Sequence, residues 1–288
     1  RFLANPRVTV EALLDGWGAE LSQGCAGRHI LAIQDTSEFN FTTTKERSRG
    51  LGKIGKGSGR GVLLHAMLGV DAETGRTARL VTRFGRVTLK RPADLARQEG
   101  LAETVEVSLV EVCEVDAPPG AEPILWRLLA THGVEDAAMA WRIVGWYRQR
   151  WHIEQFFRTL KQQGLQLEDS QLENAGRLIK LTAIAARAAC TIMQLVQARD
   201  GRSGQDAKIT FSPPQIEILH AILPELEGKT ALQKNPHPPE TLAWAAWIIA
   251  KLGGWDGYPK SKPPGPITFR HGLQYFKSLA HGWRLRNV

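Results

Sequence analysis

Cysteine is scarce in this sequence: three residues in 288, far apart at Cys25, Cys113 and Cys190. No two of them have the spacing of a disulfide framework or a zinc site, so we expect them to be reduced and structural. The eight histidines form neither an HExxH nor a CxxC…HxxxH pattern. The sequence therefore argues against a disulfide scaffold and against the common zinc enzymes.

Long apolar runs are also missing. The stretch LAWAAWIIA, which starts at Leu242, is shorter than the ~20 residues that a membrane-spanning helix needs. No signal peptide opens the chain, and we expect a cytoplasmic protein with no membrane association. Arg1 rather than methionine is the first residue, which indicates that the sequence is a fragment at its N-terminus. The glycine-rich stretch GLGKIGKGSGRG lacks the GK[ST] ending of a phosphate-binding loop, so we reject a nucleotide site there.

Basic residues exceed acidic ones, 37 to 29, giving a formal charge of +8 and an isoelectric point near 9.6. The surplus is concentrated in two runs. Residues 45–60 contain six basic side chains and one acid, and residues 76–97 contain seven basic side chains and one acid. Such runs are often ordinary solvated loops and strand faces. Two of them beside short apolar strands favour a surface for the phosphate backbone of a nucleic acid.

Strands dominate the first half of the expected fold. HILAIQDTSEFNF (residues 29–41) is an apolar run that ends in an acid, which predicts a buried strand with Asp35 at its end. Residues 61–71 predict a second strand that forms a hairpin with the first around the basic loop. Three more strands are expected in residues 78–91, 104–116 and 123–132, the middle one alternating clearly from Val105 to Val115.

Helical periodicity begins near Glu135. One helix is expected to end near Gly164, and a second to begin at a capping box made by Ser170 and Glu173. A third apolar helix follows the proline-rich entry at residues 235–239. A linker and a short terminal helix (residues 270–285) complete the chain, and no internal repeat is present.

The first of these helices carries the stretch YRQRWHIEQFFRTLK, residues 147–161. On one continuous helix, Tyr147, Arg150, Glu154 and Lys161 fall within a sector of roughly 60°. They form a face with one anion, two cations and a phenol. The simplest interpretation is a solvated face on which Arg150 and Glu154 form an ion pair worth a few tenths of a kcal/mol. The alternative is a carboxylate that binds a metal beside groups that hold phosphates.

The spacing Tyr147-x2-Arg150-x3-Glu154-x6-Lys161 resembles the Y-R-E-K signature of bacterial DDE transposases of the insertion sequence 4 family, the transposon 5 type. LAIQDTSEFNF resembles the segment that holds the family's first catalytic Asp. PILWRLLATHGVEDAAMAWRIVGWY resembles the stretch leading into the signature, and IAKLGGW…PPGP…RHGL the C-terminal region. The similarity extends over almost the whole chain.

The resemblance implies a role for each matching residue. Asp35 and Glu154 would be catalytic carboxylates that bind Mg²⁺ or Mn²⁺ in an RNase H-like site, where two metal ions serve phosphodiester cleavage. Tyr147, Arg150 and Lys161 would grip the DNA phosphates beside the scissile bond. Trp126 would stack on a base flipped out of the duplex, although a core tryptophan on a strand explains it equally well.

The sequence departs from the family in two places. The second Asp of the site should lie in a D-R-E-A-D-like stretch, which is missing near residues 75–76. Asp71 and Asp116 end strands and are candidate substitutes, but turn residues follow each of them. The family's N-terminal DNA-binding domain is also nearly absent, and RFLANPRVT resembles its tail.

We therefore expect an α/β fold with an incomplete RNase H-like catalytic core. The expected segments are the start of that core (1–75), a β-rich insertion (76–134), the signature helix with the next core helix (135–200), and a helical dimerisation region (201–288). In that last region Leu273, Phe276 and Trp283 give the terminal helix an apolar side, which would serve self-association or packing on its own domain.

The expected function is DNA transposition by a nucleoid-associated transposase. It would act as a homodimer on double-stranded DNA, namely transposon terminal inverted repeats and target DNA, with activity impaired by the missing Asp. The alternative is a catalytically inactive remnant that binds DNA, dimerises and inhibits a full-length transposase. A third option, a misfolded pseudogene product, predicts neither binding nor cleavage.

Overall fold

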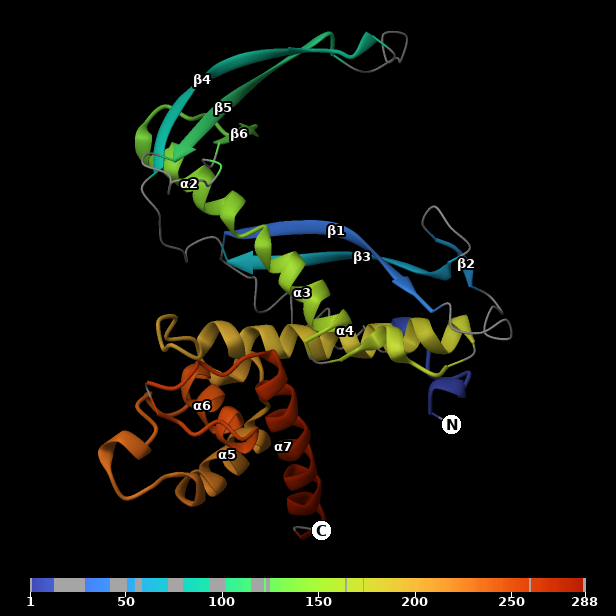
Figure 1. Ribbon diagram of the computed structural model, residues 1–288, viewed down its shortest axis with the longest axis vertical. Coiled ribbons are helices and arrows are strands. Elements are labelled where there is room, and N and C mark those ends of the chain that lie inside the picture. Colours follow the sequence, from blue (N-terminus) through green and yellow to red (C-terminus); the bar gives the residue numbers. More distant parts are fainter. Residues whose placement is uncertain are drawn as a thin grey trace. The chain divides into compact units, whose positions relative to one another are not determined.

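The computed structural model combines helices with strands in an α/β arrangement (Figure 1). It describes residues 2–12, 29–41, 51–54, 59–71, 80–93, 102–114, 122, 125–163, 165–172, 174–258 and 260–286. Two compact units divide the chain: residues 1–27, 34–67 and 153–288 form the first, and residues 28–33 and 68–152 form the second.

Within the described residues, six strands form two three-stranded sheets. They are β1 (Ile30–Asn40), β2 (Gly52–Lys53), β3 (Arg60–Asp71), β4 (Leu80–Lys90), β5 (Thr104–Glu114) and β6 (Leu125–Ala130). The strand order is β1-β3-β2 in one sheet and β4-β5-β6 in the other. The five strands that the sequence predicts are confirmed, and β2 is an additional short strand.

The expected hairpin of β1 and β3 is also confirmed, because these strands are neighbours in their sheet. The Phe41 amide donates to the carbonyl of Arg60, and Thr36 Oγ1 lies 2.7 Å from His65 Nδ1. Later residues of β1 thus pair with earlier residues of β3, which is the antiparallel arrangement.

The second sheet buries one face against helix α2 (Ala137–Arg148). Val110 pairs with Phe84 on one side and Leu128 on the other, so the three side chains share a face. Val110, Val112 and Leu128 are buried against Ile143 and Val144 of the helix. The side chains of β5 do alternate between two faces. The even-numbered residues are on the buried face, and Val105 is on the other face.

Helices make up most of the rest of the described chain. They are η1 (Phe2–Ala4), α2, α3 (Trp151–Lys161), η4 (Leu167–Asp169), α4 (Ala175–Ala198), η5 (Ala207–Ile209), α5 (Pro213–Leu226), η6 (Ala231–Gln233), α6 (Leu242–Leu252) and α7 (Pro266–Arg286).

Two boundaries differ from the sequence prediction. Helix α4 begins at Ala175, where the Asn174 side chain accepts from the Arg177 amide, and Ser170 instead ends the short helix η4. The predicted cap at Ser170 is therefore wrong, and Glu173 lies outside the described residues. Helix α5 was not predicted. The capping box of Ser212 and Gln215, with Pro213 at the first position of the helix, is a pattern that indicates a helix start.

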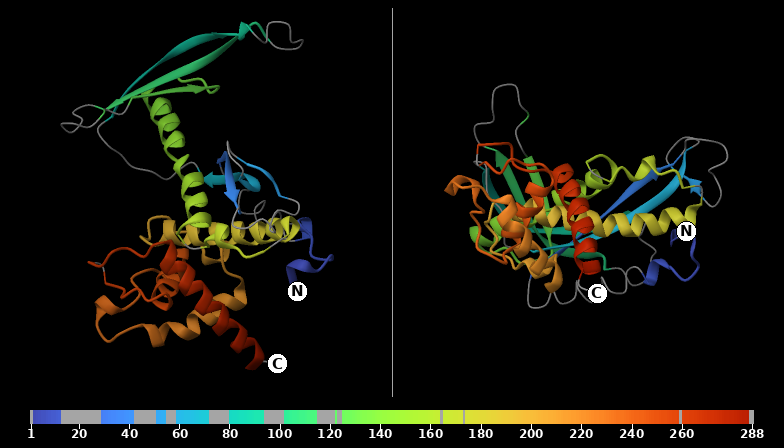
Figure 2. Two further views of the ribbon diagram at one scale, coloured as in Figure 1. Left: turned by 45° about the vertical axis from the view of Figure 1, so that its right-hand side comes forward. Right: turned by 90° about the horizontal axis from the view of Figure 1, so that it is seen from below.

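Helices α4 to α7 of the first unit share one apolar core (Figure 2). Helix α6 is its centre, because every residue from Leu242 to Ala250 is buried. Leu195 of α4, Leu219 of α5 and Phe269 and Phe276 of α7 pack into the same cluster. Helix α4 is long and apolar enough to cross a membrane by length and composition alone, and its residues Ile192 and Leu195 are buried in this core.

Glycines bring α6 and α7 into backbone contact. A Cβ atom at position 272 would overlap the carbonyl oxygen of Ile249, and one at position 253 would overlap the carbonyl oxygen of Thr268. A larger residue at either position must therefore push the two helices apart. By contrast, Gly282 of the same helix has open space around its missing Cβ.

Replacing Gly272 by alanine should lower the stability of the helical core by roughly 1–3 kcal/mol, because the added methyl group overpacks the α6–α7 contact. The matched change Gly282→Ala should raise stability by up to about 1 kcal/mol, since alanine is the better helix former. Urea unfolding followed by circular dichroism measures both. Equal effects of the two substitutions would contradict this account of the contact.

The two cysteines in the described chain, Cys113 and Cys190, are both free thiols, as expected, and Cys25 lies outside the described residues. Burial raises the pKa of the Cys190 thiol to about 12. Since the thiolate is the reactive form, Cys190 should be alkylated by iodoacetamide at pH 8 much more slowly than Cys113. Peptide-resolved mass spectrometry gives both rates, and faster labelling of Cys190 would refute the prediction.

Candidate nucleic-acid and metal site

The signature residues do not share one continuous helix. Tyr147 lies in the last turn of α2, Arg150 in the turn that follows, and Glu154 and Lys161 in α3. The expectation of one helix with all four side chains in a single sector is therefore wrong. The units divide the set as well: Tyr147 and Arg150 belong to the second unit, and Glu154 and Lys161 to the first.

The break has a local cause in hydrogen bonding. The amides of Gln149 and Arg150 donate to the carbonyls of Trp146 and Tyr147, three residues back, which tightens the chain. Both the amide and the ring Nδ1 of His152 bond to the carbonyl of Gln149, the ring at 2.7 Å. A side chain thus competes for a carbonyl that would otherwise continue the α-helical ladder.

Gln149 stands out inside this turn. It is buried, and its side-chain oxygen has no hydrogen-bond partner in the described part of the chain. An unpaired buried amide oxygen is costly, at about 1–3 kcal/mol. Periodicity cannot foresee the turn, because its sequence contains neither glycine nor proline.

Three of the predicted DNA-binding residues lie together in the second unit. The ring of Trp126, on β6, meets the ring of Tyr147 edge-on at 5.0 Å between centroids. The guanidinium carbon of Arg150 lies 5.8 Å from the centroid of the same tyrosine ring. These distances are within the range of aromatic and cation–π attraction. The predicted residues Trp126, Tyr147 and Arg150 thus form one cluster, in a fold that does not keep them on one helix.

Trp151 extends this cluster and was missed by the sequence prediction. Arg150 lies 5.7 Å from its ring, and the side chain is 55% exposed. Tyr147 is 36% exposed, whereas Trp126 is half-buried against the core of the sheet and α2. Tyr147 and Trp151 therefore present aromatic surface beside a cation. In the sequence, the position of Trp151 directly after Arg150 was the signal that could have pointed to it.

Asp35 lies in the middle of β1 rather than at its end, and the strand is largely exposed rather than buried. Both parts of that prediction are wrong. The strand continues past the acid through polar residues to Phe39, which is the one fully buried residue of the strand. The Asp35 carboxylate is exposed and accepts a hydrogen bond of 2.8 Å from the amide of Thr36.

Lys161 and Glu168 tie this strand to α3 and η4 within the first unit. The Lys161 ammonium donates to the carbonyl of Glu38 at 2.6 Å and lies 5.0 Å from the ring of Phe39. The Glu168 carboxylate accepts from the amide of Asn40 at 2.9 Å. Asp35 and Glu154 therefore stand on elements that contact one another. Glu168 was not predicted, because no local pattern links residues 128 positions apart.

The carboxylates fit a magnesium site in kind but not in number. Oxygen ligands suit Mg²⁺ and Mn²⁺, yet Asp35 and Glu154 are only two. Among the described residues, no group of three or more His, Cys, Asp or Glu side chains is placed to hold a metal ion. Asp71 is the last residue of β3, and Asp116 lies outside the described residues.

The two basic runs lie partly outside the described residues. In residues 76–97 the described strand β4 carries Arg83 and Arg86 on opposite faces, since successive side chains of a strand point to opposite faces. In residues 45–60, the guanidinium of Arg60 donates to the carbonyl of Leu51 at 3.3 Å. The described parts of the runs thus do not form a single cationic face.

A comparison of the chain with models of known protein families finds none that matches.

The ring contact of Trp126 with Tyr147 should be measurable as a coupling free energy. In a double-mutant cycle of Trp126→Leu and Tyr147→Leu, we expect about 0.5–1.5 kcal/mol of interaction beyond the sum of the single effects. Trp126→Leu combined with Trp141→Leu is the control, because Trp141 makes no ring contact with Trp126 in the described structure. Additive behaviour of the Trp126–Tyr147 pair would show that the cluster does not form.

Proposed function

We propose that this chain acts on DNA as a member of the DDE transposases of the insertion sequence 4 family. Its ligands would be double-stranded DNA, namely transposon terminal inverted repeats and target DNA. The observation that supports this most is the cluster of Trp126, Tyr147 and Arg150. The resemblance assigns DNA contacts to these residues independently of any structure, and they contact one another across two elements.

The cluster suits DNA chemically because it offers three kinds of contact. An aromatic face can stack on an unpaired base for roughly 1–3 kcal/mol. The guanidinium of Arg150 matches the oxygens of a phosphate. The hydroxyl of Tyr147 has no hydrogen-bond partner in the described residues and can donate to another phosphate oxygen.

Lys161 would serve the same DNA through the donors that its protein contact leaves over. An ammonium group has three N–H donors, and the Glu38 carbonyl takes one of them. The family role of a phosphate contact therefore remains compatible with its structural role of holding β1.

The carboxylates Asp35 and Glu154 would hold the metal ion, Mg²⁺ or Mn²⁺, in the proposed RNase H-like core. Two carboxylates are too few for the pair of ions that an in-line displacement uses, so we derive no catalytic step through the metal. The alternative function gains weight from that shortage: a chain that binds DNA without cutting it and inhibits a complete transposase. We also propose a cytoplasmic, nucleoid-associated location.

Self-association through α7 needs a changed interpretation. Of the two expected uses of this apolar side, Leu273 and Phe276 show the second: they pack against the core of their own unit, and Trp283 remains 39% exposed. The homodimer stays a proposal. Deleting residues after Pro266 cannot test it, because the deletion would remove Phe269 and Phe276 from the core.

Duplex binding should weaken steeply with salt. We expect affinity for a random-sequence DNA duplex, measured by fluorescence anisotropy, to fall by at least tenfold between about 50 and about 200 mM KCl, as phosphate contacts release counterions. Arg150→Gln should weaken binding at both salt concentrations, whereas Arg202→Gln, which removes an exposed arginine paired with Asp200, should not. Salt-independent affinity, or an equal effect of both variants, would contradict the proposal.

Cleavage should be weak or absent. Incubated with supercoiled plasmid and Mg²⁺ or Mn²⁺, the 288-residue chain should bind but hardly nick the DNA, since the stretch with the second Asp of the site is missing from its sequence. Inserting the missing second-Asp segment should restore nicking, and Glu154→Ala in that restored protein should abolish it. Robust nicking by the unmodified chain that Asp71→Asn or Asp116→Asn abolishes would show that one of these residues completes the site.

A further inference from the structure

Basic side chains occur along most of helix α7. Helix α7 contains no aspartate or glutamate in its 21 residues. Its buried side, with Phe269, Phe276 and Ala280, packs into the core of the first unit. The exposed residues of the helix therefore need an explanation separate from its packing.

Four basic residues lie in a row beside the buried side, and we name them the α7 stripe: Arg270, Lys277, His281 and Arg284. Their offsets of 7, 11 and 14 residues place them within a sector of about 60°. At 1.5 Å per residue the row is about 21 Å long. Lys277, His281 and Arg284 are exposed, and Arg270 is half-buried.

The stripe has no acidic partner in the described part of the chain. Arg127, Arg202 and Lys208, by contrast, each lie within 4 Å of a carboxylate. No such ion pair is made by Lys277 or Arg284 within the described residues, and Arg270 contacts only His271, at 2.7 Å. A row of uncompensated cations raises the local concentration of a polyanion.

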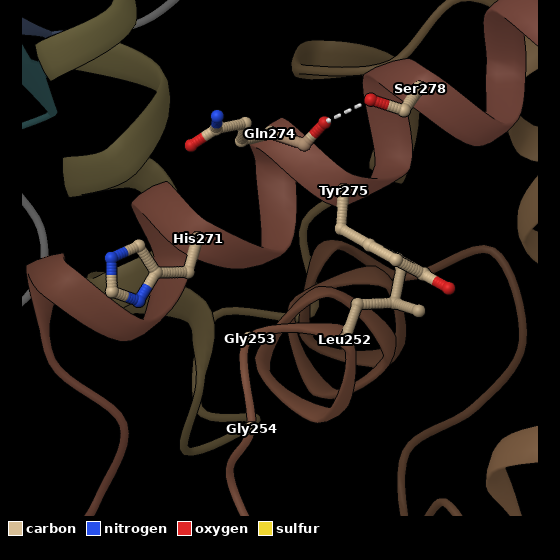
Figure 3. A pocket seen from close by; sticks show the side chains of 7 residues that line it. All are labelled: Leu252, Gly253, Gly254, His271, Gln274, Tyr275 and Ser278. Atoms are coloured by element: carbon tan, nitrogen blue, oxygen red, sulfur yellow. Dashed lines mark hydrogen bonds between the residues drawn. The ribbon is translucent and has the colours of Figure 1, made fainter.

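The surface beside the stripe is open and uncharged. The side chains of His271, Gln274, Tyr275 and Ser278 line a depression of about 510 Å³ against the turn at Gly253 and Gly254 (Figure 3). The Ser278 hydroxyl donates to the carbonyl of Gln274 and so turns toward its own helix. A bulky ligand can therefore lie along α7 without meeting an acidic wall.

A second copy of the chain fits this surface less well than a polyanion does. Two α7 stripes facing one another would bring like charges together, which costs free energy. Leu273 and Phe276, which could offset this cost, are already packed in the core. The exposed apolar side chains of α7 lie outside the sector of the stripe: Ile267, Tyr275, Trp283 and Leu285. Duplex DNA, by contrast, presents a phosphate every 3.4 Å along each strand, so that several phosphates span a row of about 21 Å.

We propose that the α7 stripe binds the phosphate backbone of duplex DNA, as a surface separate from the residues around Tyr147. The choice of DNA as the polyanion rests on the proposed function. The contact is sequence-independent, because cations on a helix face meet phosphates and not base edges.

The test compares two double variants of equal charge change: Lys277→Gln/Arg284→Gln in the stripe, and Arg202→Gln/Lys208→Gln in the same unit. Glutamine keeps helix propensity, so the stripe variant should retain its circular dichroism. Losing two phosphate contacts should reduce the slope of log affinity against log salt by about 1.8. Random-sequence duplex titrated at several salt concentrations gives the slope for each protein.

The expected result is a smaller slope and at least tenfold weaker binding at low salt for the stripe variant, with little change in the control. Equal slopes in the two variants, while the unmodified chain binds DNA, would overturn the stripe and leave the proposed function standing. Failure of the unmodified chain to bind DNA would instead overturn the proposed function. A stripe variant that changes oligomeric state in light scattering, with DNA affinity unaltered, would identify a self-association surface and overturn the proposal.

Discussion

Two hydrogen bonds to backbone atoms fasten the strand that carries Asp35 to the segment that carries Glu154. Lys161 donates to the carbonyl of Glu38, and Glu168 accepts from the amide of Asn40. Because β1 is at the edge of its sheet, its outer backbone groups have no neighbouring strand to pair with among the described residues. Charged side chains supply those partners, and charge-assisted bonds are about twice as strong as neutral ones. The relation between the two carboxylates therefore depends on this tie.

The tie also gives Lys161 a structural role in addition to the proposed one. If its ammonium is removed, the strand end loses a partner and the position of Asp35 relaxes, whether or not Lys161 ever touches DNA. A loss of function in a Lys161 variant would therefore not by itself prove a phosphate contact. Arg150 likewise has a structural role beside the proposed one, because it contacts the rings of Tyr147 and Trp151.

Sequence patterns predicted the elements better than their ends and interruptions. Strand alternation found β4, β5 and β6, and periodicity found α6, because these signals repeat over many residues. The start of α4 at Asn174 and the turn at Gln149 depend on single hydrogen bonds, which repeat nowhere and leave no period. The break at Gln149 matters most, because it turns a face of four residues into two separate groups.

The residues of the candidate site were predicted on other grounds than the helices and strands. The DNA-binding roles of Trp126, Tyr147, Arg150 and Lys161 were inferred from a resemblance, and the structure brings the first three into contact with one another. Residues that act on one another over long separations in the chain, such as Glu168 with Asn40, could not be found in this way. Neither could Trp151, whose exposure only a structure can give.

Binding and chemistry make different demands on this chain, and the described residues meet them unequally. Phosphate contacts add up from separate cations, so a surface that has lost some of them still binds DNA with a smaller salt dependence. Metal-assisted displacement is not additive in this way, because a missing ligand removes nucleophile activation and leaving-group stabilisation together. A chain with Arg150, Lys161 and the α7 stripe but only two of the expected carboxylates can therefore keep the proposed affinity for DNA even where the proposed cleavage activity is lost. Of the two proposed functions, DNA binding is the one that depends less on any single residue.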